Sequence, residues 1–176
     1  MNSVAGWWVI AAGLLQPAWC DCLTLTQGIT AQLAPAAKLA VPATLSLVNS
    51  GATFQPFFGT LAVTYRVRTS PGGGGSITLQ ATSDFAPAGG PSVAAGSLTY
   101  ACSNATLGTP CGGRQIAGAS SQSPVLNVPP GACTGGGAAC SATDPNSIQV
   151  TFSLDNDSGI GTGSYAAQIM FVISAI

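Results

Sequence analysis

The chain contains no histidine and no glutamate, and charged side chains make up only 5% of its 176 residues. Nucleophilic hydrolases need an imidazole or an equivalent base, and glycosidases need two carboxylates, so this composition argues against an enzyme and its cofactors. A surface with so few charges has almost no long-range field, which argues against binding to nucleic acid. The low charge also leaves little repulsion between copies and favours self-association.

Helix signals are nearly absent beyond residue 20, because no segment keeps a 3.6-residue apolar period and glycine and proline interrupt the chain throughout. Strand signals are frequent, and the alternation of apolar and polar residues is clearest at 61–68 and 148–154. Weaker strands are expected at 23–30, 43–49, 76–83, 97–102 and 124–128. Roughly eight short strands separated by turn signals predict an all-β fold, an immunoglobulin-like β-sandwich.

A last strand is expected over residues 165–173, where both faces carry apolar side chains, which predicts a central strand or one covered on both sides. The glycine-rich stretches 71–75 and 155–163 each separate two alternating segments and predict hairpin loops. Residues 102–147 are rich in Gly, Ser and Pro, and we expect them to form a long insertion rather than a second domain.

The first 20 residues have the pattern of a secretory signal peptide. Residues 6–15 form an apolar stretch too short to span a bilayer, and small residues precede a cut after Cys20. We therefore expect an exported single domain over 21–176, secreted or held at the cell surface, with no membrane span after cleavage. The stretch carries no preceding Lys or Arg, so an uncleaved anchor or a buried strand stays an alternative, as do cleavage after Cys22 and lipidation of either cysteine.

Four further cysteines fall in the 102–147 insertion: Cys102, Cys111, Cys133 and Cys140. An exported chain meets an oxidising compartment, where disulfides are the default. Pairing of Cys102 with Cys111 and of Cys133 with Cys140 closes two short loops and is favoured, with the nested arrangement as the alternative. Zinc binding is disfavoured because the chain has no histidine and no Cys-x-x-Cys spacing.

Two small groups of side chains are candidate ligand sites. Asp155 and Asp157 lie in a Gly-rich turn, where such residues usually bond to their own backbone, although the alternating oxygens also resemble a calcium loop. Phe54, Phe57 and Phe58 are expected in the core or a turn, or else as an exposed aromatic patch that binds a partner or glycan. No other metal site is predicted.

The closing segment Gly163-Ser164-Tyr165 and the alternating strand that follows it to Ile173 resemble secreted bacterial β-sandwich proteins of the spore coat U and fimbrial-subunit type. The resemblance implies an immunoglobulin-like sandwich, and several such proteins assemble on the surface by donating a strand to a neighbour. The 102–147 insertion departs from the pattern of that group.

A candidate for such a strand lies directly after the leader. Residues 23–33 alternate, and their apolar positions include Leu23, Leu25, Ile29 and Leu33. A terminal strand of this kind can pair internally or can extend the free edge of a neighbour's sheet. We therefore expect a non-catalytic structural or adhesive subunit that associates with copies of itself or related subunits, in a pilus or a coat. The alternative is a monomeric secreted module that binds carbohydrate or acts with calcium.

Overall fold

The computed structural model describes residues 28–49, 51, 53–132 and 146–176. The chain divides into two units, Met1–Gln32 and Leu33–Ile176. In the first unit the described residues, 28–32, are exposed and belong to no strand or helix. The second unit holds the ten strands found among the described residues, together with the core.

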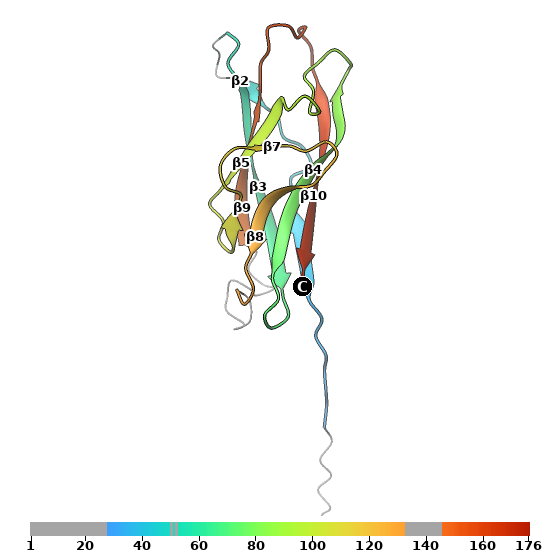
Figure 1. The fold of residues 1–176 in the computed structure, drawn as a ribbon, viewed down its shortest axis with the longest axis vertical. Helices are drawn as coiled ribbons and strands as arrows, with labels where there is room; N and C mark the ends of the chain where they lie inside the picture. The colour runs from blue at the N-terminus through green and yellow to red at the C-terminus, as the bar shows by residue number, and fades with distance from the viewer. Residues whose placement is uncertain (1–27, 50, 52, 133–145) are drawn as a thin grey trace, which may run out of the picture. The chain divides into compact units, whose positions relative to one another are not determined.

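The second unit is built from two antiparallel sheets, and none of its described residues is helical (Figure 1). The first sheet has the order β1-β3-β9-β5-β7, and β2 also pairs with β3. Its strands are β1 (Ala36–Ala40), β2 (Val48–Asn49), β3 (Phe57–Arg68), β5 (Leu98–Ser103), β7 (Gln115–Ile116) and β9 (Asn146–Leu154). The second sheet has the order β10-β4-β8-β6, with β4 (Gly75–Ala86), β6 (Thr109–Pro110), β8 (Ser123–Val128) and β10 (Ala166–Ala175). The all-β prediction is confirmed.

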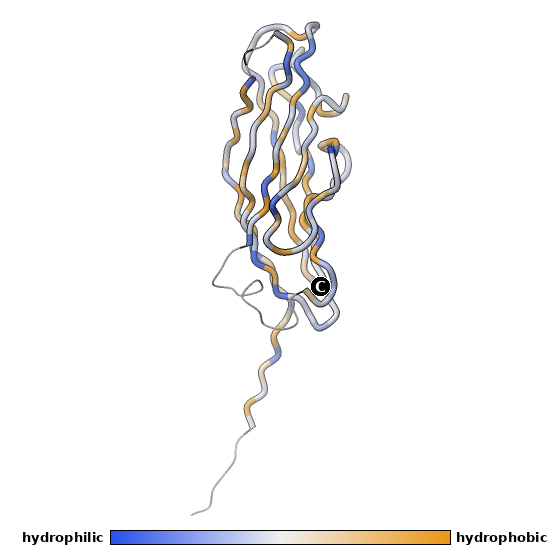
Figure 2. The backbone as a smooth tube through the Cα atoms, turned by 90° about the vertical axis from the view of Figure 1, so that its left-hand side faces the viewer, coloured by the Kyte–Doolittle hydropathy of each residue, from blue (hydrophilic) through white to orange (hydrophobic). Residues whose placement is uncertain are grey.

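The core lies between the inward faces of the two sheets. Successive side chains of a strand point to opposite faces, so every second residue of the long strands enters the core, and apolar and polar residues accordingly alternate along the tube in Figure 2. Val63 and Tyr65 of β3, Ile77 of β4 and Val150 of β9 are each at most 1% exposed. Burying this apolar surface is the main stabilising contribution to the fold.

Two tyrosine hydroxyls that reach into the core donate to backbone carbonyls. The hydroxyl of Tyr100 on β5 donates to the carbonyl of Pro124 on β8 at 2.6 Å and so joins the two sheets. The hydroxyl of Tyr65 donates to the carbonyl of Leu107. Burial raises the pKa of both phenols, and that of Tyr100 reaches about 12.

A disulfide joins Cys102, near the end of β5, to Cys111, just after β6, with the two Cα atoms 5.3 Å apart. Because β5 and β6 belong to different sheets, the bridge closes a nine-residue separation across the two layers. This half of the favoured connectivity is confirmed, and the nested alternative is excluded. Residues 133–145, which include Cys133 and Cys140, lie outside the described residues. The predicted leader lies outside them as well.

The two predicted hairpins are wrong. Residues 71–75 connect β3 to β4, and 155–163 connect β9 to β10, but in each case the two strands belong to different sheets. Both Gly-rich stretches therefore cross from one layer to the other. Alternation identifies a strand and its inward face, but it does not identify the strand's neighbour, so a cross-over and a hairpin have the same pattern in the sequence.

Three predicted strands also need correction. Of residues 43–49 only the last two form a strand, β2, whereas β1 was not expected. The described part of 23–30 is not a strand. The last strand, β10, is at the edge of its sheet rather than central, and Met170 on its outer face is 42% exposed. Because both faces of this segment carry apolar side chains, the sequence predicted a central strand where the structure has an edge strand.

Candidate functional site: an apolar groove beside the last strand

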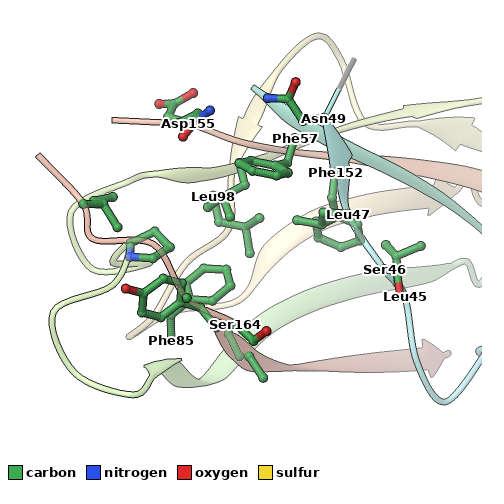
Figure 3. Close-up of a pocket in the computed structure, with 18 of the residues that line it drawn as sticks. Leu45, Ser46, Leu47, Asn49, Phe57, Phe85, Leu98, Phe152, Asp155 and Ser164 are labelled. Carbon is green, nitrogen blue, oxygen red and sulfur yellow. The ribbon is translucent and has the colours of Figure 1, made fainter. Parts of the chain in front are cut away.

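A groove with a volume of about 1070 Å³ opens on one side of the core, where the two sheets are not joined (Figure 3). One wall is the edge strand β10, and the other is formed by β2, β3 and β9 together with the segment 41–47, which we call the strap. Leu47 and Phe152 both point into the opening between these walls. The groove exposes part of the core to solvent.

The β10 wall combines apolar side chains with an unpaired strand edge. Ala167, Ile169 and Phe171 point inward but stay only partly buried, whereas their partners in β4, Leu79 and Ala81, are buried. In the described residues β10 forms a ladder with β4 alone. Its other edge approaches β1, and over residues 166–171 it borders the groove without a ladder partner. Within Ala166–Ala175 there is no Pro and no charged residue, the usual protections of an exposed edge.

The strap forms the opposite wall. It connects β1 to β2, and both of these short strands pair with β3, at its two ends. Val41, Leu45 and Leu47 of the strap are half-buried and pack against the core cluster. The strap itself belongs to neither sheet, so the middle of β3, residues 59–63, has no partner on that side.

Polar loops form the rim at the upper end of the groove. The side-chain amides of Asn49 and Asn156 both donate to the carbonyl of Gln55, the latter at 3.2 Å. The Tyr165 hydroxyl donates to the carbonyl of Gly161 at 2.9 Å. The bond from Asn156 joins the 53–57 segment to the 156–165 loop at this end of the groove.

A carboxylate fixes a third loop of the rim. Asp84 accepts hydrogen bonds from the Ser92 hydroxyl at 2.7 Å and from the backbone N–H of Val93 and Phe85 at 2.6 and 2.8 Å. These hydrogen bonds lower the pKa of Asp84, and the bond from Ser92 makes the largest contribution. The closed loop holds Phe85 and Pro91 against the groove.

The three predicted aromatic residues separate in the structure. Phe57 is half-buried and Phe54 is 58% exposed, and both line the groove, whereas Phe58 is 45% exposed and does not. Phe58 lies opposite Val48 on the outer face of the sheet, and Phe54 has φ of 59°. Val48 and Phe58 therefore form an exposed apolar pair at the β2–β3 end, whereas Phe54 and Phe57 both border the groove.

The candidate calcium residues are used in other contacts. Asp155 accepts from the Arg114 guanidinium at 3.1 Å, and Asp157 accepts from the backbone N–H of Gly159 at 2.8 Å, as a turn carboxylate does. In the described part of the chain, no three His, Cys, Asp or Glu side chains gather into a metal-binding group.

Ile29 and Leu33 of the predicted assembly strand are 92% and 75% exposed, whereas Leu23 and Leu25 fall outside the described residues. Sequence reasoning missed the groove itself, namely the strap and the inward face of β10. Alternation within 43–49 was the available signal, but it was interpreted as an ordinary strand.

The groove is lined mainly by apolar side chains. Of the described residues that line it, Asp155 and Asp157 alone are charged, and both lie in the rim loop. In the described residues no helix is long and apolar enough to cross a bilayer. No protein-family model matches the chain, and no curated protein matches it either.

Proposed function

We propose that this protein is a non-catalytic, exported surface subunit with an immunoglobulin-like sandwich fold, and that it assembles by accepting a β-strand from another copy into the groove. The observation that carries the proposal is the unpaired edge of β10 beside half-covered apolar side chains. An entering strand would pair with that edge through its backbone and would bury alternate side chains against Ile169 and Phe171.

The strand that fits best is residues 23–33 of a second copy. It has no charged residue, as an apolar groove requires, and its odd-numbered positions include Leu25, Ile29 and Leu33. Among these, Ile29 and Leu33 are solvent-exposed. Burying a large aliphatic side chain contributes about 1.5–3 kcal/mol, so two or three of them would add about 3–9 kcal/mol to the backbone bonds of the junction.

The chemistry of the remaining surface is compatible with a subunit outside the cell. A disulfide is present, and such bonds persist in oxidising compartments. The near absence of charge leaves little repulsion to oppose close packing of many copies into a pilus or a coat.

Light scattering behind a sizing column on the exported full-length chain tests the proposal. Ile169→Asn places an amide in the groove, and Met170→Asn makes the same change on the outer face of the same strand. We expect the wild type and Met170→Asn to form a ladder of oligomers, and Ile169→Asn to remain monomeric with an unchanged far-ultraviolet circular dichroism spectrum. A monomeric wild type, or an Ile169→Asn ladder equal to that of Met170→Asn, would contradict strand donation.

A second candidate function rests on a different observation, the exposure of the Phe54 and Phe58 rings. A monomeric binding module for carbohydrate would use these rings as stacking surfaces. Glycan-array binding by a monomeric wild type, abolished by Phe54→Ser together with Phe58→Ser, would favour this module over the assembling subunit.

A further inference from the structure

The strap contains more residues than the part of β3 that lies beside it. At one end Ala40 pairs with Thr64, and at the other Val48 pairs with Phe58. Between these two pairs the strap has seven residues, 41–47, whereas β3 has five, 59–63. Antiparallel strands pair residue for residue, so the two extra residues force the strap away from β3.

The strap is held by side chains alone. It has no ladder partner in either sheet, and none of the described turn and loop backbone hydrogen bonds involves it. Its second residue, Pro42, has no backbone N–H to donate. What fixes the strap is the half-burial of Val41, Leu45 and Leu47 in the groove. A segment with few backbone bonds and partial burial opens at a low free-energy cost.

We propose that the strap, which forms one wall of the groove, is also its autoinhibitory cover: Val41, Leu45 and Leu47 occupy part of the surface that an incoming strand would bury, and the strap must move aside for assembly. This inference rests on the proposed function and names how that same site is regulated. Before assembly, Leu45 and Leu47 shield the groove from water. During assembly, a donor strand that pairs with β10 gains backbone bonds that the strap does not make, and therefore displaces it.

The register shows where the strap would go. If Ala43 and Thr44 were removed, residues 41, 42, 45, 46 and 47 would face 63, 62, 61, 60 and 59 in order. Val41 would then lie opposite Val63 and Leu45 opposite Leu61, whose side chains point into the core. Pro42 and Ser46 would point outward, and Pro is tolerated on an edge strand. Thus β1, the shortened strap and β2 would form one continuous strand.

The test uses the full-length chain lacking Ala43 and Thr44, and a control in which these two residues are exchanged for each other. Hydrogen exchange of the strap amides is measured first, before assembly. In the wild type and the control, the amides of Leu45–Leu47 should exchange at least about 100-fold faster than those of β1, because they have no ladder partner. In the deletion variant they should be protected to within about tenfold of β1.

The rate of oligomer growth is measured next. With the groove permanently uncovered, the deletion variant should assemble at least about tenfold faster than the control. Equal rates, or wild-type strap amides as protected as β1, would overturn the strap as a cover while leaving strand donation intact. Fast strap exchange with no assembly of any chain would instead overturn the proposed function, so the two failures are distinguishable.

Discussion

Gly59 of β3 and Leu47 of the strap lie so close that a Cβ atom added to Gly59 would be 2.7 Å from the Cδ2 atom of Leu47. The same atom would be 2.9 Å from the carbonyl oxygen of Ser46. Both distances are shorter than a normal carbon contact. Glycine at this position therefore allows the strap to cross over β3 and to place Leu47 in the groove.

Gly59→Ala is expected to destabilise the fold by about 1–3 kcal/mol, because the strap backbone must shift to make room for the methyl group. Gly112→Ala is the matched control, since a Cβ atom there meets no atom within 4 Å, and its effect should stay within about 0.5 kcal/mol. Urea unfolding at neutral pH measures both. Equal stability of the two variants would mean that the strap does not lie over Gly59.

The Tyr100 hydroxyl is expected to stabilise the contact between the two sheets. Tyr100→Phe leaves the Pro124 carbonyl without its 2.6 Å donor in a part-buried site, which should cost about 1–3 kcal/mol. Tyr165→Phe removes a similar bond at an exposed site and should cost less. Chemical unfolding of both variants measures the difference, and a larger loss in Tyr165→Phe would contradict this assignment.

The raised pKa of the Tyr100 hydroxyl predicts that the folded state loses stability at alkaline pH. Burial raises the pKa of Tyr100 to about 12 from the 10.0 of an exposed tyrosine, so the folded state holds this proton more tightly than the unfolded state. The stabilisation is complete below pH 10 and is lost as the pH rises from about 10 to about 12. Unfolding curves across this range should fall less steeply for Tyr100→Phe than for the wild type. Parallel curves would show that Tyr100 does not cause the loss.

Removing the disulfide is expected to destabilise the unit without changing its fold. Cys102→Ser with Cys111→Ser should cost about 2–3 kcal/mol, mainly because the unfolded chain gains freedom when a short loop is no longer closed. Thermal unfolding of the variant and of the oxidised wild type measures the loss. An unchanged midpoint would indicate that the bridge is not formed in the exported protein.

The sequence predicted the strands better than their arrangement. Alternation located most of β3, β4 and β9, because side chains on one face must be apolar to form the core. It failed for the partners of those strands, since the 71–75 connection crosses between sheets and local periodicity contains no information on which strand lies alongside. The position of β10 was mistaken because its inward face borders a groove and its outer face carries Met170.

The candidate site was predictable only in part. The alternation of residues 23–33 is a local property of the sequence, and the role of this segment as a donor strand stays a prediction. The groove could not be predicted, since it depends on a mismatch of two residues between the strap and β3, two segments separated in the chain. Only the pairing register of β1 and β2 shows that mismatch.

The most direct test of strand donation mixes two full-length variants that are each defective in one partner of the junction. Ile29→Asn with Leu33→Asn disables the donor strand, whereas Ile169→Asn disables the groove. Thr30→Asn with Gln32→Asn, on the opposite face of the donor strand, is the control for the first variant. Each variant is measured alone and in an equimolar mixture by light scattering behind a sizing column.

Each defective variant alone should be monomeric, and the control should form oligomers. In the mixture, the intact strand of the Ile169→Asn chain can enter the intact groove of the other chain, but no further copy can add at either end. The account therefore predicts heterodimers and nothing larger. A mixture that stays monomeric, or a defective variant that still forms a ladder alone, would contradict assembly by strand donation.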